Sequence, residues 1–437
     1  MKTKERIKTV LLIVLLIGAV FLTYSTWFFD NPTSGGFLDV IRRGSGYDYS
    51  DEQLDGEIIS DARFNLYPLR LSFKNASGRF AVPYDAELTA HIYDKSNSIL
   101  RIALTKPSVA ETTHDEWIAA LGKNCVLFDF EGLVPISVLA TSVGAPSDDT
   151  LSQHGRYLLI SEDGLFFKNP YTATQFRISD LPDTALVTAL SGVSGTPCRL
   201  AYEAHDAAYK NAAPETVVTD IAPSVFTLNC YSASSFFGAE QLAALLKILG
   251  LNYSTCGNYT EQNGTLVFTQ ELNTVKVAPD GLVTYTDPHA ASDSSQSGLF
   301  VSGGARLPSD IQVISSANHI IAQLDTLVEK GGDLYIQDTS IPTASGERVI
   351  RYGLSVDGVP IDRQKTGYCA EVATNGRRIT KIVFYMRSYE RAATSAVIMP
   401  KKIAAASLPS GGLGLIGLRY TDGGQASMAP EWYIKTK

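Results

Sequence analysis

Three glycines near the C-terminus match a nucleotide-binding pattern in spacing alone. Gly412, Gly414 and Gly417 form G-x-G-x-x-G, which in dinucleotide-binding proteins places a pyrophosphate at the start of a helix. That chemistry requires a strand before the glycines and a helix after them. Here the glycines follow Pro409 and precede the strand-like residues 418–421. We interpret the segment as a loop leading into a strand, and we predict no cofactor.

Other residue types that carry chemistry are dispersed along the chain. None of the six histidines forms the H-x-x-x-H or H-E-x-x-H spacing of a zinc site. No serine lies in a G-x-S-x-G elbow, and the nearest string, at residues 192–195, is one residue short. Asp129 and Glu131 would share one face of a strand, where two acids are usually solvated. We therefore expect no metal site, no catalytic residues and no enzymatic activity.

The cysteines leave two interpretations open. The chain has five, without any C-x-x-C pair: Cys125, Cys198, Cys230, Cys256 and Cys369. Outside the cell a disulfide such as one between Cys230 and Cys256 would form. The odd number and the wide spacing favour reduced, partly buried thiols instead.

The balance of charge excludes one large class of partner. The net charge is −8, and no cluster of Lys and Arg follows Lys8. Nucleic-acid binding needs such a cluster to neutralise phosphates, so we expect no nucleic-acid partner. The length of 437 residues suggests two or three domains.

The N-terminal segment predicts a membrane anchor. Residues 10–29 contain no charge, and an apolar helix of roughly 20 residues spans a hydrocarbon core of about 30 Å. Lys2, Lys4, Arg6 and Lys8 precede it, whereas Asp30 and a polar stretch follow it. By the positive-inside rule the N-terminus is cytoplasmic and the chain after the anchor is extracytoplasmic. The anchor crosses the membrane once and contacts its lipid.

The predicted anchor has two kinds of candidate site residue. Small residues let helices approach closely in lipid and form the expected contact face: Gly18, Ala19 and Ser25. Aromatic residues form the expected anchor at the outer membrane interface: Tyr24, Trp27 and Phe28. The alternative is a cleaved signal peptide, but the apolar core is longer than usual and no Ala-x-Ala-like site follows Trp27.

Composition and patterning divide the chain into five parts. We predict an α+β fold, in which a transmembrane helix is followed by several domains of mixed, mainly antiparallel sheets with packed helices. The predicted limits are 1–29 for the tip and anchor, 30–56 for a stalk, 57–228 for an N-terminal domain, 229–304 for a middle domain and 305–437 for a C-terminal domain.

Local signals place the first elements of the N-terminal domain. Thr113 and Glu116 form a capping box for a helix that Gly122 ends. Residues 125–130 form a strand, and Pro135 opens a short helix. Residues 156–168 form a hairpin whose turn contains Asp163 and Gly164.

The last two predicted domains share a pattern of a helix followed by strands. The first copy has a helix at 239–249 and strands at 264–270, 273–277 and 282–285. The second has a helix at 316–329 and strands at 333–337, 348–356, 368–372 and 379–387. We interpret the two as a weak internal repeat with a similar topology.

Several short blocks together resemble the YycH family of membrane-anchored regulatory proteins. The basic tip with Ile7, Lys8 and Thr9 before Leu11, and Trp27 at the outer edge, resembles the family's opening. Three further blocks also resemble the family. In chain order they are Glu116 to Ile118 with residues 126–130 and 134–136, Leu249 to Asn252 with residues 264–268 and 277–281, and residues 429–434 around Trp432.

The resemblance implies both a fold and a role. It implies three extracytoplasmic domains, of which the last two share an α/β topology also found in the companion protein YycI. It implies a protein without catalysis that associates with the sensor histidine kinase WalK and with YycI, and so tunes a cell-wall two-component system. Because residues 30–56 match no family pattern, the binding surface is not carried over. A membrane-anchored ligand-binding module or cell-envelope enzyme is the competing hypothesis.

Overall fold

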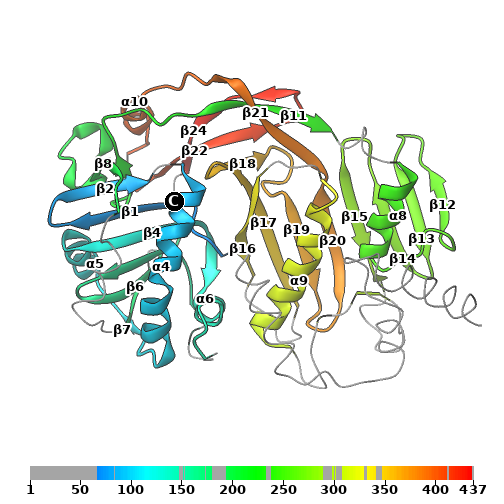
Figure 1. Cartoon of the computed structure of the whole chain (residues 1–437), viewed down its shortest axis with the longest axis horizontal. Helices are drawn as coiled ribbons and strands as arrows, with labels where there is room; N and C mark the ends of the chain where they lie inside the picture. The colour runs from blue at the N-terminus through cyan, green and yellow to red at the C-terminus, as the bar shows by residue number, and fades with distance from the viewer. Residues whose placement is uncertain are drawn as a thin grey trace, which may run out of the picture. The chain divides into compact units, whose positions relative to one another are not determined.

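The computed structural model separates the chain into two units, Met1–Gly56 and Glu57–Lys437. It describes residues 66–82, 84–146, 151, 153–172, 174–179, 193–232, 238–288, 298–299, 301, 308–328, 332–340, 347–410 and 413–435. These residues form a mixed α+β fold with mainly antiparallel sheets and few helices, as the sequence predicts (Figure 1).

The first sheet contains eight strands of the described chain. In spatial order they are β3 (Ala110–Glu111), β7 (Thr174–Ser179), β6 (Gly164–Asn169), β5 (His154–Ser161), β4 (Cys125–Pro135), β1 (Arg70–Asn75), β2 (Gly78–Val82) and β8 (Thr196–Pro197). Every pairing in this sheet is antiparallel, and the predicted hairpin is formed by β5 and β6.

The second sheet joins two helix-plus-meander units, as the repeat predicts. The first meander is β12 (Gly257–Thr260), β13 (Leu266–Gln270), β14 (Asn273–Val277) and β15 (Leu282–Thr286). The second is β16 (Asp333–Thr339), β17 (Arg348–Val356), β19 (Ala370–Thr374) and β20 (Ile379–Tyr385), with β18 (Val359–Arg363) inserted after β17. The two meanders meet where β15 pairs with β20.

The C-terminal strands extend this sheet and add a third one. β22 (Leu415–Asp422) pairs in parallel with β18 and antiparallel with β24 (Pro430–Lys435). A small sheet has the order β21 (Arg387–Ser395), β11 (Phe226–Ser232) and β23 (Ser427–Met428). β9 (Arg199–Leu200) and β10 (Val217–Val218) form a short ribbon. β22 begins directly after Gly414 and contains Gly417, so the described part of the G-x-G-x-x-G string leads into a strand, as predicted.

The helices lie on the sheets at positions that their caps and apolar faces explain. They are α4 (Ala86–Thr105), α5 (His114–Gly122), α6 (Ile136–Ser142), α8 (Ala239–Ile248), α9 (Asp310–Asp325) and α10 (Lys401–Ala406), with short 3-10 turns at Ala201–Glu203 and Ala207–Tyr209. The predicted capping box of Thr113 and Glu116 starts α5. α8 and α9 cover one face of the second sheet (Figure 1).

One helix begins earlier than predicted. α9 runs over Asp310–Asp325 instead of residues 316–329. The reason is a second capping box, in which Ser309 accepts from the backbone N–H of Gln312 while the Gln312 side chain accepts from the backbone N–H of Ser309. The apolar periodicity locates the middle of a helix, whereas its first turn is set by this cap.

The first sheet is covered on both faces. Along β4, Val126 and Phe128 face the core beneath α4 and α6, whereas Cys125 and Leu127 face a second cluster that contains Trp117 of α5. Side chains of a strand alternate between the two faces of a sheet. A strand buried on both faces is therefore expected to be mostly apolar, and β4 is apolar except at Asp129 and Glu131.

A strand and a strand pairing cross two of the predicted domain limits, and the limits remain predictions. β11 runs across the limit at 228/229. The pairing of β15 with β20 carries one sheet across the limit at 304/305. The middle and C-terminal parts thus share backbone hydrogen bonds and one apolar core.

Candidate functional site

A network of buried ion pairs joins the first sheet to β22. Asp129 and Glu131 of β4 lie between Arg70, Arg156 and Arg419. Arg156 Nε lies 2.7 Å from Asp129 Oδ1, and Arg156 Nη2 lies 2.7 Å from Glu131 Oε2. Arg419 Nη2 lies 2.6 Å from Glu131 Oε1. The prediction that the two acids are solvated is therefore wrong, since the Glu131 side chain is only 4% exposed.

The backbone of β4 explains why the two acids turn inward together. The register of β4 against β5 shifts between Asp129 and Val134, and Glu131 has a φ of 60°. Gly132 follows, and a Cβ added there would lie 2.2 Å from the carbonyl oxygen of Ile336 in β16. A bulge with a glycine at the closest approach thus brings β4 against β16 and places Glu131 among the arginines.

The charges in this network stabilise one another. Burial alone raises the pKa of Asp129, but Arg156 and Arg70 outweigh it and hold the pKa below its ordinary value. Asp129 is therefore ionised at neutral pH and accepts hydrogen bonds from both arginines.

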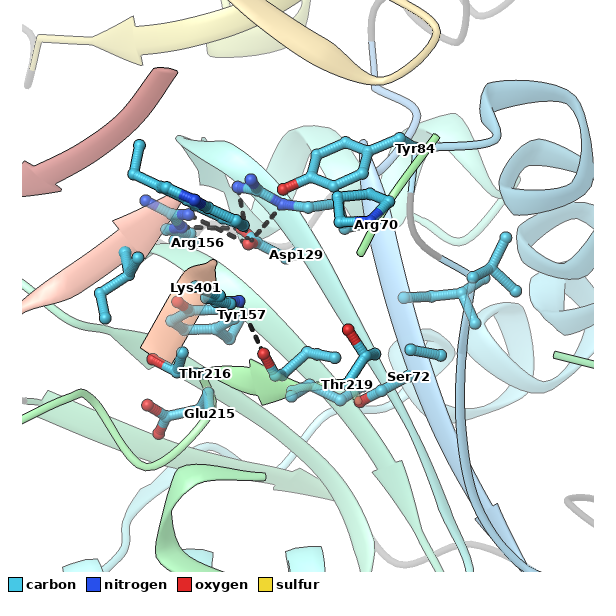
Figure 2. Close-up of a pocket in the computed structure, with 18 residues that line it drawn as sticks. Arg70, Ser72, Tyr84, Asp129, Arg156, Tyr157, Glu215, Thr216, Thr219 and Lys401 are labelled. Atoms are coloured by element: carbon cyan, nitrogen blue, oxygen red, sulfur yellow. Dashed lines mark hydrogen bonds and ion pairs between the residues drawn. The ribbon is translucent and has the colours of Figure 1, made fainter. Parts of the chain in front are cut away.

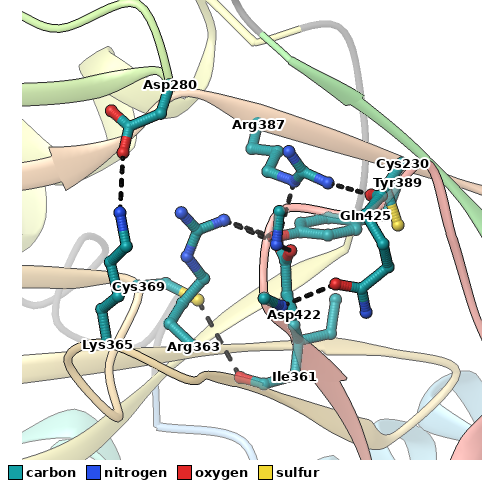
Figure 3. Close-up of polar contacts among 12 residues, drawn as sticks. Cys230, Asp280, Ile361, Arg363, Lys365, Cys369, Arg387, Tyr389, Asp422 and Gln425 are labelled. Atoms are coloured by element: carbon teal, nitrogen blue, oxygen red, sulfur yellow. Dashed lines mark hydrogen bonds and ion pairs between the residues drawn. The ribbon is translucent and has the colours of Figure 1, made fainter.

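A second buried carboxylate ties β18, β21 and β22 together (Figure 3). Asp422 Oδ2 lies 2.5 Å from Arg363 Nη1, 2.9 Å from Arg387 Nε and 2.6 Å from the Tyr389 hydroxyl. Burial raises the pKa of Asp422, but the hydrogen bond from Tyr389 and the nearby Arg363 bring it below its ordinary value. Asp129 and Asp422 each accept from or pair with several side chains of neighbouring strands, an arrangement typical of carboxylates that stabilise the packing of strands.

A third buried carboxylate borders a small cavity. Glu215 Oε1 accepts from Trp117 Nε1 at 2.7 Å and from Lys168 Nζ. Its other oxygen, Oε2, has no hydrogen-bond partner in the described part of the chain, and the same holds for the hydroxyl of Ser72. Both residues line a cavity of about 70 Å³ (Figure 2). Buried polar atoms of this kind are commonly satisfied by ordered water, for which this volume has room.

A larger groove adjoins this cavity. It has a volume of about 430 Å³ and shares Thr219, Pro223, Lys401 and Trp432 with the smaller cavity. Lys401 Nζ donates to the carbonyl oxygen of Val217 at 2.6 Å and lies 5.3 Å from the centre of the Trp432 ring. Lys401 is thus the charged residue that borders both spaces.

The surroundings of Lys401 shift its titration. Burial is the largest cause that lowers the pKa of Lys401, and the nearby positive charge of Arg70 is the second. Together they lower it to about 7, while Cys198 and Asp129 oppose the shift. Arg156, Tyr157 and Glu215 also line the adjoining cavity. Lys401 is therefore an amine that changes charge near neutral pH.

The site residues predicted from the sequence fall outside the described residues. These are the small residues Gly18, Ala19 and Ser25 and the aromatic residues Tyr24, Trp27 and Phe28. Among the helices that the structure does describe, none is long and apolar enough to cross a membrane. Within the described ranges, no group of His, Cys, Asp and Glu is arranged to hold a metal ion. All five cysteines are free thiols in the structure, and four of them are buried.

The sequence analysis missed the groove and the ion-pair network for different reasons. Lys401 and Trp432 are brought together where α10 contacts β24 and Trp432 Nε1 donates to the carbonyl oxygen of Met399, a contact that no local pattern reveals. The alternation of Asp129 and Glu131 within an otherwise apolar strand was a visible signal. Acids in a strand that is buried on both faces require cationic partners.

With the fold described, comparison with solved structures gives one finding. The structure of YycH from Bacillus subtilis matches with a TM-score of 0.52 over 86% of this chain and 95% of that chain, at 10% sequence identity. The fold is similar to that of YycH. No protein-family model matches the chain, and no curated protein matches its sequence. At this identity the similarity to YycH concerns the fold alone, and it confirms the YycH-like fold that the sequence predicts.

Proposed function

We propose that this chain is a non-catalytic, single-pass membrane regulator of a two-component system that controls cell-wall homeostasis. Residues 10–29 form the anchor, with the N-terminus in the cytoplasm and the domains outside it. The chain associates with a sensor histidine kinase of the WalK kind and with a YycI-like companion protein. The observation that carries this proposal is the YycH-like fold over 86% of the chain.

Two further observations support the proposal. The charge asymmetry around residues 10–29 favours a membrane anchor in this orientation, and the short blocks that resemble the YycH family are spread over the whole sequence. The buried carboxylates Asp129, Glu131 and Asp422 have arginine partners that hold sheets together. These carboxylates thus stabilise the packing of the sheets.

Replacement of the anchor tests the proposal directly. Residues 10–29 are exchanged for an unrelated apolar helix of equal length, and phosphorylation of the response regulator is measured in membranes. We expect loss of control over the kinase, because helix packing in the membrane transmits the effect. Kinase control that persists with the foreign helix would contradict the proposed role of the anchor.

A milder change locates the contact face. Gly18→Leu and Ala19→Leu should weaken association with the kinase, because larger side chains keep helices apart. Ile13→Leu is the matched control, since it preserves size and hydrophobicity on the helix face opposite the small residues. Co-purification of each variant with the kinase from the same membranes is the measurement, and equal recovery of all three would count against this face.

A further inference from the structure

The groove beside α10 has an apolar lining that reaches the surface. Ile221 and Met399, which line it, are 66% and 54% exposed, and Trp432 forms part of its wall. Its volume of about 430 Å³ lies in the range of roughly 300–1,000 Å³ typical of sites for small molecules. Exposed apolar side chains around a hollow of this size favour a ligand with an apolar body.

The charged residues at the rim of the groove are paired with one another. Lys402 Nζ lies 2.8 Å from Asp206 Oδ2, and Arg199 Nη2 lies 3.6 Å from Asp220 Oδ1. The rim therefore carries no excess charge of either sign, and it offers no strong preference to an ionic ligand.

The ion-pair networks that reach the adjoining smaller cavity are balanced too. Their cations and carboxylates are equal in number: Arg70, Arg156, Arg419 and Lys168 against Asp129, Glu131, Asp362 and Glu215. Lys401 is additional to this set. Among the described residues, no carboxylate forms an ion pair with its ammonium group, which donates to the carbonyl oxygen of Val217.

An anion placed at Lys401 would supply the missing counter-charge. In a partly buried site an opposite charge favours the ionised form of a lysine, so such a ligand and a protonated Lys401 stabilise each other. One uncompensated cation matches one negative charge. A dianion such as a phosphate monoester would leave a buried negative charge unpaired, which is costly.

We propose that the groove binds a molecule with a single carboxylate on an apolar body, the carboxylate pairing with Lys401 and the body lying against Trp432 and Met399. The smaller cavity, with Ser72 and Glu215, then holds ordered water beneath the carboxylate. This binding site does not depend on whether the chain associates with a kinase.

Calorimetry on the full-length chain in lipid nanodiscs tests the proposal, with empty nanodiscs as the blank. The probes are 4-phenylbutyrate and N-acetyl-Leu-Phe with a free carboxyl terminus, each compared with its neutral amide. We expect both acids to bind at least tenfold more tightly than their amides. Tighter binding of 4-phenylbutyrate would indicate a small molecule as the natural ligand, and tighter binding of N-acetyl-Leu-Phe would indicate the C-terminus of a peptide.

Two lysine variants make the test specific. Lys401→Met keeps the length of the side chain and removes its charge, and we expect at least a tenfold loss of affinity for the acids. Lys247→Met is the matched control, because Lys247 is exposed on α8 and lines neither the groove nor the smaller cavity, and we expect less than a twofold change. Met399→Ser should weaken the acids and the amides alike.

Proton uptake provides a readout that does not require the Lys401 variant to fold. Because the pKa of Lys401 is lowered to about 7, binding of a carboxylate at pH 7 should take up about half a proton. Titrations in two buffers of different ionisation enthalpy measure this uptake. Equal binding of acid and amide, binding without proton uptake, or no binding at 10 mM acid would each overturn the proposal.

Discussion

At the scale of single residues, Glu131 shows how a buried acid can hold distant parts of a chain together. Its carboxylate pairs with Arg70 of β1, Arg156 of β5 and Arg419 of β22. Arg419 lies 288 positions from Glu131 in the sequence. Its left-handed backbone conformation is tolerated because these contacts fix the side chain.

Removal of the Glu131 charge should destabilise the protein strongly. In Glu131→Gln, the buried Arg156 and the partly buried Arg70 and Arg419 lose a counter-ion, which we expect to lower the free energy of unfolding by about 3 kcal/mol. Urea denaturation of the full-length chain in detergent is the measurement. Glu162→Gln is the control, an exposed position where a change within about 0.5 kcal/mol is expected. An equal effect of both substitutions would contradict the role of the network.

Asp422 should make stability depend on acid pH. Its pKa is lower in the folded than in the unfolded chain, so the unfolded chain binds more protons at acid pH. The stabilisation is therefore complete above the unfolded value of about 4 and is lost as the pH falls through the folded value.

The corresponding experiment compares Asp422→Asn with the wild type from pH 7 to pH 2. The variant should be less stable at neutral pH, and the difference should shrink as the pH falls below about 4. Asp280→Asn removes a half-exposed acid that lies 3.5 Å from Lys365 and serves as the control. A difference that stays constant over this range would show that ionisation of Asp422 does not stabilise the fold.

At the scale of elements, β4 and β16 bring the two large sheets into close contact. Gly132 lies in β4 where any side chain would meet the backbone of Ile336 and Gln337. The contact positions the bulge that carries Glu131, and it thereby links sheet packing to the ion-pair network.

A methyl group at Gly132 should separate these strands. Gly132→Ala places a Cβ within 2.2 Å of a carbonyl oxygen, and we expect a loss of about 1–3 kcal/mol in the free energy of unfolding. Gly122→Ala is the matched control, because a Cβ there meets nothing within 4 Å. Thermal unfolding of both variants compares them, and a stable Gly132→Ala protein would refute the close packing.

Elements with local signals were predictable, and those without them were not. The capping box at Thr113 and the helix at Ala239–Ile248 follow from spacing over a few residues. β18 was missed although Asp357 and Gly358, with φ values of 52° and 74°, form a tight turn before it. The ion pair of Glu131 with Arg419 of β22 spans 288 positions, and the groove at Lys401 joins residues 199–223 to residues 398–402 and Trp432, so no local window contains either.

At the scale of the whole molecule, the fold and the anchor prediction point to the same proposal. The described residues have a YycH-like fold built from a double-faced sheet and two joined meanders. The proposed anchor holds this fold at the membrane, where a kinase partner lies within reach. This chain and the YycH of Bacillus subtilis have a similar architecture at 10% sequence identity, and the partner of this chain has to be identified by experiment.

Co-purification from membranes tests the central claim most directly. The tagged full-length chain is isolated under mild detergent from the cells that produce it naturally, and the associated proteins are identified by mass spectrometry. The account predicts recovery of a sensor histidine kinase and a YycI-like protein, with both lost when residues 10–29 are exchanged for an unrelated helix. Recovery of the intact chain at the membrane without any histidine kinase would contradict it.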